Sequence, residues 1–193
     1  MSYRHVALMG RAGAGKDAAA ARLVQRYQFT RVAFADPLRD AALGLDPIIG
    51  SEPTGYGPIP LRLSDAVRRH GWDRAKGAPE VRRTLQRLGE SIRAHDPEHW
   101  IRLALAKVDV ADRWGLPVVI TDVRHVNEAR ALTRRGFLLV RVVRPGHQGP
   151  AGEDQRQHVS ETALDGFLAD AELINGGSLA ELHSAADRLA VRR

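Results

Sequence analysis

The sequence of 193 residues contains no cysteine, which excludes disulfides, thiol nucleophiles and thiolate metal sites. No apolar run approaches the roughly 18 residues that a membrane span needs. The first ten residues also lack the basic, apolar and small-residue succession of a signal peptide. We therefore expect a cytoplasmic protein with no membrane partner, whose chemistry uses oxygen, nitrogen or a bound ion.

Lysine is scarce as well, because Lys16, Lys76 and Lys107 are the only lysines among 29 basic residues. The net charge of +6 favours an anionic partner, which composition leaves open between nucleic acid, a membrane surface and small phosphorylated molecules. With 44% hydrophobic and 27% charged residues, the chain can bury one substantial core. We expect a single domain over residues 1–193.

Lys16 belongs to the stretch GRAGAGKD at residues 10–17. This stretch matches the GxxxxGK pattern of phosphate-binding loops. A shuffled chain of this composition would contain about 0.03 such matches. An apolar run precedes the loop and an alanine-rich, helix-favouring segment follows it, which is the order that a phosphate loop requires. Backbone N–H groups of residues 13–16 would then surround a phosphate, with Lys16 reaching the β- and γ-phosphates. Asp17 stands where the usual pattern has a Ser or Thr that binds magnesium.

Short apolar runs alternate with helix-favouring segments along the chain, at residues 5–9, 31–36, 116–122, 137–145 and the start of 171–189. This alternation predicts an α/β fold of three layers, in which helices flank a five-stranded parallel sheet. Ligands of such sheets bind at the carboxyl ends of the strands. The last helix should begin with a capping box formed by Ser178 and Glu181.

Acidic residues end two of the expected strands, Asp36 the run 31–36 and Asp122 the run 116–122. Asp36 reads either as a helix cap or as a group that orients an acceptor. Asp122 ends an apolar β-branched run, where it can hold magnesium through water or cap the next helix. The following segment, 123–136, predicts a helix, and its Arg124 emerges at the same rim and places a positive charge where phosphates would lie.

The segment 79–95 predicts a helix whose apolar stripe includes Val81 and Leu85. A second stripe carries Arg83 and Gln86, which either face a phosphorylated ligand or form a solvated charged surface. Residues 44–60 are rich in Gly and Pro and read as a long loop. Residues 146–158 read as a flexible connection that can act as a flap.

Three classes of phosphate-loop protein remain to be separated. A GTPase needs a guanine-reading NKxD segment, yet neither Asn127 nor Asn175 is followed by lysine. A nucleic-acid-dependent ATPase suits the basic charge, but no stripe alternates arginines with aromatic residues as strand-binding platforms do. A small-molecule kinase accounts for the arginines, the long loop and the flap. Another small-metabolite kinase of the same fold stays an alternative.

Several segments taken together resemble the bacteriophage deoxynucleoside monophosphate kinases, which belong to the P-loop nucleoside monophosphate kinases. The matching stretches are GRAGAGKD, FADPLRDA, VRRTLQRLGESI with Trp100 after it, ITDVRHVNEA, VVRPG, HVSE and LINGGSLAEL. The resemblance implies an adenylate-kinase-like fold with a substrate-binding insertion at about 44–95 and a short lid at about 146–160. It also implies transfer of phosphate from ATP to a deoxynucleoside monophosphate, with Mg²⁺, in the host cytoplasm if the protein is phage-encoded.

The resemblance further assigns roles to residues of this sequence. The catalytic residues would be Lys16, Arg124 and Arg144. ATP would be bound by Gly10, Arg11, Gly13, Ala14, Gly15, Lys16, Asp17, Ala18 and Asn175. The monophosphate substrate would be bound by Asp36, Arg83, Gln86, Trp100, Asp122, Arg124 and Glu161, and the metal by Asp17 and Asp122. We expect no stable nucleic-acid binding, and the helix surfaces permit either a monomer or a homodimer.

Overall fold

The computed structural model describes residues 3–147 and 163–193. The chain divides into two compact units, one formed by Met1–Phe34 with Ala104–Arg193 and the other by Ala35–Leu103. The expectation of a single domain over residues 1–193 stays a prediction. In the described ranges, no helix has the length and apolar character that crossing a membrane requires.

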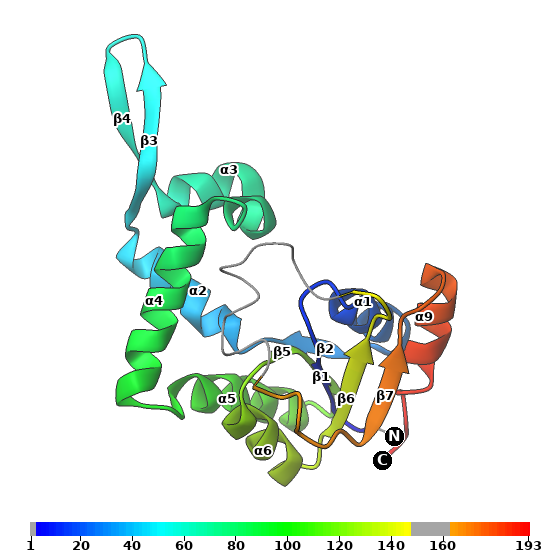
Figure 1. Cartoon of the computed structure of the whole chain (residues 1–193). Helices are drawn as coiled ribbons and strands as arrows, with labels where there is room; N and C mark the ends of the chain where they lie inside the picture. Colours follow the sequence, from blue (N-terminus) through cyan, green and yellow to red (C-terminus); the bar gives the residue numbers. More distant parts are fainter. Residues whose placement is uncertain (1–2, 148–162) are drawn as a thin grey trace. The chain divides into compact units, whose positions relative to one another are not determined.

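The first unit is built on a five-stranded sheet in the order β2-β5-β1-β6-β7 (Figure 1). Its strands are β1 (Val6–Met9), β2 (Thr30–Val32), β5 (Val118–Val123), β6 (Leu138–Val143) and β7 (Ala171–Ile174). Every neighbouring pair is parallel. Strands buried on both faces of a parallel sheet read as continuous apolar runs, and this is why the sequence pattern predicts them. The five-stranded parallel sheet is confirmed.

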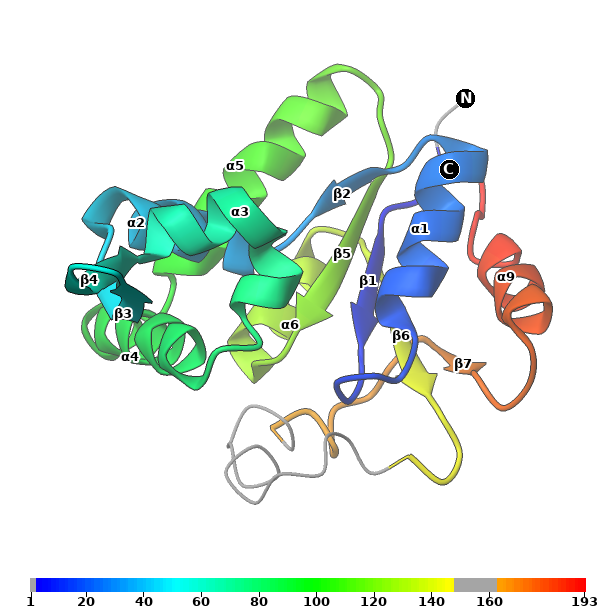
Figure 2. The same ribbon diagram turned by 90° about the horizontal axis from the view of Figure 1, so that it is seen from above.

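Helices cover both faces of this sheet. On one face α1 (Lys16–Tyr27) and α9 (Leu179–Asp187) lie side by side, and on the other lie α6 (Val126–Arg134) and the part of α5 (His99–Arg113) that belongs to this unit (Figure 2). Alternate β1 residues serve opposite faces, so that Val6 and Leu8 join the core beneath α1 and α9. The predicted three-layer α/β fold is therefore confirmed.

The start of α9 carries the predicted capping box. The Ser178 N–H donates to Glu181 Oε2 at 2.6 Å, and the Glu181 N–H donates to Ser178 Oγ at 3.3 Å. The hydrogen bond from the Ser178 N–H holds the pKa of the Glu181 carboxyl below its ordinary value. The cap fixes where α9 begins, directly after the turn that follows β7.

The second unit contains α2 (Ala35–Leu45), α3 (Leu63–Ala75), α4 (Pro79–His95) and the hairpin of β3 (Ile48–Thr54) and β4 (Gly57–Arg62). Its core includes Ala42, Leu63, Ala66, Val81 and Leu85. The predicted apolar stripe of α4 is thus confirmed at its two buried positions.

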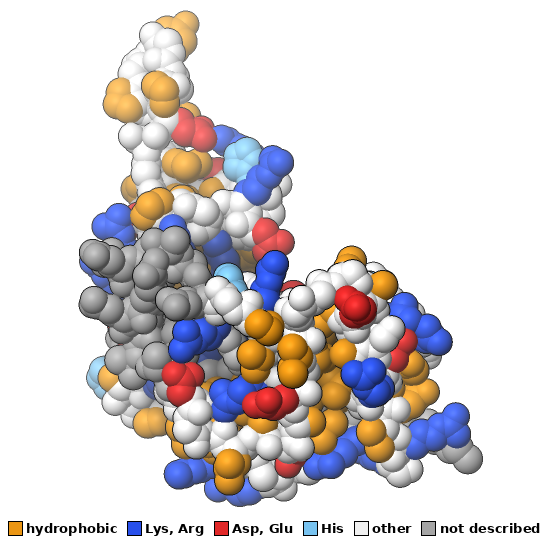
Figure 3. Space-filling model, turned by 45° about the vertical axis from the view of Figure 1, so that its right-hand side comes forward, with side chains coloured by type: hydrophobic (Ala, Val, Ile, Leu, Met, Phe, Trp, Pro, Cys, Tyr) orange, Lys and Arg blue, Asp and Glu red, His pale blue; other side chains and the backbone are white. Residues whose placement is uncertain are grey.

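The prediction of a long loop over residues 44–60 is wrong, because most of this segment forms the antiparallel hairpin. Three prolines lie in its strands, with Pro53 opposite Pro58 and Pro60 opposite Ser51. These are alternate pairs of the ribbon, and alternate residues of a two-stranded ribbon point their N–H groups away from the partner strand, where a proline removes no ladder bond. Hydrophobic side chains lie exposed along the hairpin (Figure 3), including a fully exposed Tyr56 at its tip.

Two element boundaries also differ from the predictions. The second strand ends at Val32, so Asp36 lies in the first turn of α2 and does not end a strand. The intervening Phe34 gives its N–H to the Asp122 carboxylate instead of to a neighbouring strand, at 2.9 Å. The helix after β5 begins only at Val126, which leaves Arg124 in the connection before it.

Candidate active site

The phosphate loop connects β1 to α1 and depends on its glycines. A Cβ on Gly10, whose φ is +134°, would lie 2.4 Å from the carbonyl oxygen of Val142. A Cβ on Gly15, whose φ is +106°, would lie 2.5 Å from Asn175 Nδ2. Real Cβ atoms do not approach other atoms so closely, so both positions of the GxxxxGK pattern require glycine here.

Side chains hold the carbonyl groups of this loop. The ammonium of Lys16 donates to Gly10 O at 2.6 Å and to Arg11 O at 2.8 Å. Asn175, just after β7, donates from Nδ2 to Ala14 O at 2.9 Å. These side-chain hydrogen bonds to the loop carbonyls fix the shape of the loop together with its backbone conformation. The structure places Lys16 and Asn175 at the loop, as the assignment of both to ATP binding requires, although that assignment stays a prediction.

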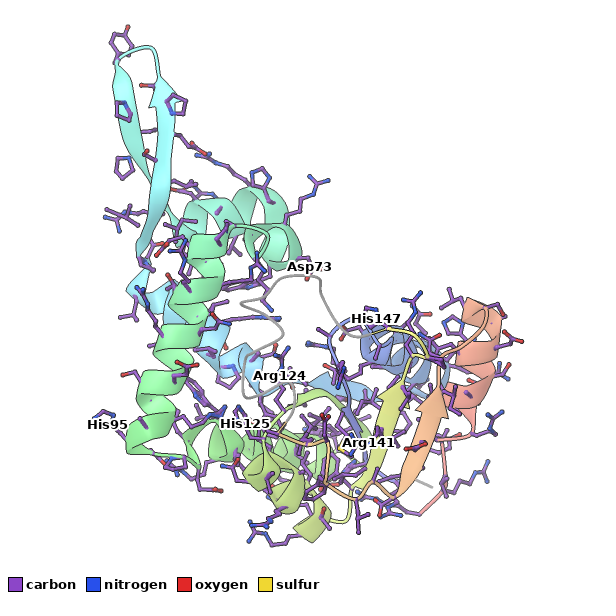
Figure 4. The ribbon with its side chains drawn as sticks, in the orientation of Figure 1. Asp73, His95, Arg124, His125, Arg141 and His147 are labelled. Atoms are coloured by element: carbon purple, nitrogen blue, oxygen red, sulfur yellow. The ribbon has the colours of Figure 1, made fainter. Side chains whose placement is uncertain are left out.

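A pocket of about 240 Å³ opens beside the loop. The predicted site residues that line it are Gly10, Arg11, Ala14, Arg124 and Arg144. Residues that sequence reasoning did not single out also line it, among them Arg141, His147 and Asp165. Four arginines around one pocket favour an anionic ligand with several charged oxygens. Figure 4 labels three of these residues: Arg124 after β5, Arg141 within β6 and His147 after β6.

Arg141 is one of these unpredicted residues and lies within β6. Its Nη2 donates to Leu164 O at 2.8 Å and to Phe167 O at 2.6 Å. These bonds hold the turn at residues 163–166 to the sheet and keep the guanidinium in the pocket wall. The sequence feature that could have identified Arg141 is its place as a lone arginine inside the apolar run LLVRVV, because a buried strand accepts a cation only where the cation has partners.

Glu128 is a second unpredicted residue, and it supports Arg124. Its carboxylate is buried, with the residue only 2% exposed, and Oε2 accepts N–H bonds from Arg124 at 2.8 Å and His125 at 3.0 Å. A carboxylate at a helix N-terminus satisfies backbone donors that lack helical partners. The sequence feature that could have identified Glu128 is its position three residues after His125, which is the spacing of a capping box. Glu128 thus fixes the backbone from which Arg124 reaches the pocket.

The two carboxylates assigned to metal binding differ in surroundings. Asp122 is half-buried near the end of β5, and its Oδ1 accepts the Phe34 N–H at 2.9 Å. Asp17 is exposed in the first turn of α1. In the part of the chain that the structure describes, no group of three or more His, Cys, Asp or Glu side chains forms a metal cluster. Ala18, also in the first turn of α1, packs against the core below the loop.

The predicted substrate residues of the second unit lie on three of its helices. Asp36 lies 3.4 Å from the Arg39 guanidinium, while Arg83 and Gln86 are exposed on α4, with Arg83 at 3.5 Å from Glu80. Trp100 is buried and its Nε1 donates to Gly89 O at 3.3 Å, which ties α5 to α4. Glu161 and most of the predicted lid at 146–160 lie outside the described residues. Substrate binding by these residues stays a prediction.

Comparison with known proteins identifies the family. The model of the deoxynucleotide monophosphate kinase family matches residues 65–186. A protein of Acanthamoeba polyphaga mimivirus, provisionally named deoxynucleotide monophosphate kinase, is 31% identical over 189 residues, which cover 93% of this chain and 92% of that protein. The deoxynucleotide monophosphate kinase of Escherichia phage RB69 is 28% identical over 145 residues, which cover 74% of this chain and 57% of the phage protein.

Among solved structures, a Thermus thermophilus protein aligns with 98% of this chain and 97% of its own, at 15% identity and a TM-score of 0.48. That likeness is too weak to carry a conclusion. The family model and the mimivirus relative, by contrast, cover most of the sequence. The chain belongs to the deoxynucleotide monophosphate kinase family.

Proposed function

We propose that this protein transfers the γ-phosphoryl group of ATP to a deoxynucleoside 5′-monophosphate, giving the diphosphate and ADP. The observation that carries the proposal is the phosphate loop of residues 10–16, which opens onto a pocket lined by Arg124 and Arg144. Membership of the kinase family makes nucleotides the substrates. The loop supplies a place for the triphosphate, and the arginines supply positive charge beside it.

The reaction needs positioning and charge neutralisation more than proton transfer. An oxygen of the acceptor phosphate, already ionised near neutral pH, attacks the γ-phosphorus, and the bond to the bridging oxygen of ADP breaks in line with it. Lys16 binds the β- and γ-phosphates, while Arg124 and Arg144 stabilise the charge that spreads over the transferring group. No covalent enzyme intermediate is required.

Magnesium binding fits the residues present at the site. Asp17 and Asp122 offer carboxylate oxygens, the ligands that Mg²⁺ prefers, and the bond from the Phe34 N–H orients the Asp122 carboxylate. Mg²⁺ takes few protein ligands and completes its shell with water and phosphate oxygens, so two carboxylates are a sufficient protein contribution. Bound there, the ion neutralises part of the triphosphate charge.

The acceptor nucleotide is bound by Asp36, Arg83, Gln86, Trp100 and Glu161. A guanidinium next to an amide on one helix face can bind a phosphate through several N–H donors. The reaction proceeds without nucleic acid, and the chain works as a monomer or a homodimer.

Two pairs of variants test these roles in an assay of ADP release. Lys16→Ala should lower kcat/KM at least 10³-fold, on the order of what removing a central phosphate ligand costs. Lys107→Ala is its matched control, because Lys107 is exposed on α5. Arg83→Ala should raise the KM for the deoxynucleoside monophosphate about tenfold or more with little change in the KM for ATP. Arg87→Ala, exposed on the same helix, is its control.

Unchanged turnover of Lys16→Ala would remove the phosphate-loop assignment. If the Arg83 and Arg87 substitutions change the KM for the monophosphate equally, Arg83 is only a solvated charge on the surface. ATP hydrolysis that depends on added DNA would overturn the proposed reaction in favour of a nucleic-acid-dependent ATPase, whose affinity for DNA should fall steeply with salt.

A further inference from the structure

Besides the Ala14 carbonyl, which Asn175 binds, the Ala12–Gly13 peptide of the phosphate loop is also held by a residue from outside the loop. His147 lies after β6, and its Nε2 is 2.8 Å from the carbonyl oxygen of Ala12 (Figure 4). A carbonyl oxygen only accepts hydrogen bonds, so Nε2 carries the proton and donates. The His147 N–H in turn donates to Arg144 O at 3.1 Å, which holds the histidine in the turn after β6.

Because of peptide geometry, the hydrogen bond between His147 and the Ala12 carbonyl also determines the direction of the Gly13 N–H. No described peptide bond is cis, and in a trans peptide the C=O of one residue and the N–H of the next point in opposite directions within one plane. Fixing the Ala12 carbonyl toward His147 therefore directs the Gly13 N–H away from the imidazole. Phosphate loops bind anions through such backbone N–H groups, and a donor that already points correctly needs no reorientation on binding.

The sequence of the loop leaves room for this ring. A Cβ on Gly13 would lie 2.7 Å from His147 Nε2 and 3.1 Å from Cε1. Gly13 also has a φ of +78°, which side-chain-bearing residues rarely adopt. Gly13 occupies a variable position of the GxxxxGK pattern, so the phosphate-loop motif alone does not call for glycine there. The close approach of His147 is a local reason for it.

We propose that His147 is a positioning residue for ATP, which holds the Ala12 carbonyl so that the Gly13 N–H is presented to the triphosphate. The inference rests on the proposed ATP site and adds to it a residue that the phosphate-loop motif does not contain. His147 also connects the turn after β6 to the loop, and Arg144, three residues before it, lines the same pocket.

Substitutions at His147 separate the hydrogen bond from the bulk of the ring. Glutamine places an amide N–H near the position of Nε2 and keeps the bond, whereas asparagine reaches only the position of Nδ1 and loses it. Isothermal titration should show that His147→Asn raises the Kd for ATP about tenfold, as expected for the loss of one oriented donor. His147→Gln should restore most of that loss, and both variants should bind the deoxynucleoside monophosphate as the wild type does.

His95→Asn is the matched control. His95 is exposed on α4 and its Nδ1 is 2.9 Å from Ser91 O, so the substitution also alters a histidine that contacts a backbone carbonyl. Its Kd for ATP should equal the wild-type value. Circular dichroism and thermal unfolding of each variant establish that the proteins compared are folded.

The outcomes distinguish the inference from the function on which it rests. Wild-type protein that does not bind ATP would overturn the proposed ATP site itself. If the wild type binds ATP, an unchanged Kd in His147→Asn would overturn the positioning role and leave the site intact. An equal loss in His147→Gln and His147→Asn would also overturn it, because the donated bond would then not be what matters.

Discussion

Replacing Glu128 by alanine should destabilise the first unit and weaken catalysis together. The substitution removes the acceptor of two N–H bonds, from Arg124 at 2.8 Å and His125 at 3.0 Å, at a residue only 2% exposed. Each buried donor that loses its partner costs about 1–3 kcal/mol. The donors belong to partly exposed residues at the start of a helix, so the lower part of that range applies, about 2–4 kcal/mol for both.

Thermal unfolding and steady-state kinetics measure the two consequences. For a chain of this length 1 kcal/mol shifts Tm by about 2–4 °C, so Glu128→Ala should lower Tm by roughly 5–15 °C. Glu128→Gln keeps an acceptor oxygen without its charge and should cost about half as much, because charge-assisted hydrogen bonds are about twice as strong as neutral ones. Below Tm, kcat of the alanine variant should fall about tenfold, because the backbone that carries Arg124 is no longer fixed.

Glu172→Ala serves as the control, because this glutamate is exposed on β7 and should change stability by less than about 0.5 kcal/mol. A Glu128→Ala protein with wild-type Tm and kcat would show that the two hydrogen bonds to Glu128 contribute neither to stability nor to catalysis. A lower Tm with unchanged kcat would show that Glu128 stabilises α6 without positioning Arg124.

Burial is the main cause that holds the pKa of His5 below its ordinary value of 6.5, and the positive charge of Arg193 is the second. The His5 Nδ1 accepts the Val118 N–H at 2.9 Å, and its Nε2 donates to Asp112 at 2.8 Å. The unfolded chain therefore takes up the proton first, so the free energy of unfolding should fall as the pH drops below about 6.5 toward the folded-state pKa; a pH series of urea titrations should give a flatter dependence for His5→Gln. Gly10→Ala should lose ATP binding and about 2 kcal/mol or more of stability, because its Cβ would meet the Val142 carbonyl at 2.4 Å; a variant with wild-type Tm and Kd would contradict the described loop geometry.

The sheet was predictable because its signals are local. A strand buried on both faces must be apolar along most of its length, and VVITDV and LLVRVV are apolar except at Thr121, Asp122 and Arg141. Asp122 and Arg141 form hydrogen bonds with backbone groups. The hairpin at residues 48–62 was not predicted, because glycine and proline usually interrupt strands. The three prolines fit only because the ribbon has two free edges, a property of strand pairing that composition does not reveal.

The same distinction separates the parts of the site. The phosphate loop is one continuous motif whose glycines are demanded by contacts at the loop itself. Arg141 and His147 instead form hydrogen bonds to backbone carbonyls that lie 23 and 135 residues away in the chain. A side chain that binds a main-chain carbonyl far away in sequence carries no spacing rule, so only the fold shows which histidine or arginine meets the loop.

One coupled assay of ADP release tests the proposed reaction, with ATP and each deoxynucleoside and ribonucleoside 5′-monophosphate in turn, and with DNA as a separate addition. The proposed kinase reaction should give ADP release that depends on at least one deoxynucleoside monophosphate, with formation of the matching diphosphate and no stimulation by DNA. Release with no deoxynucleoside monophosphate at all, or release that only DNA stimulates, would contradict it.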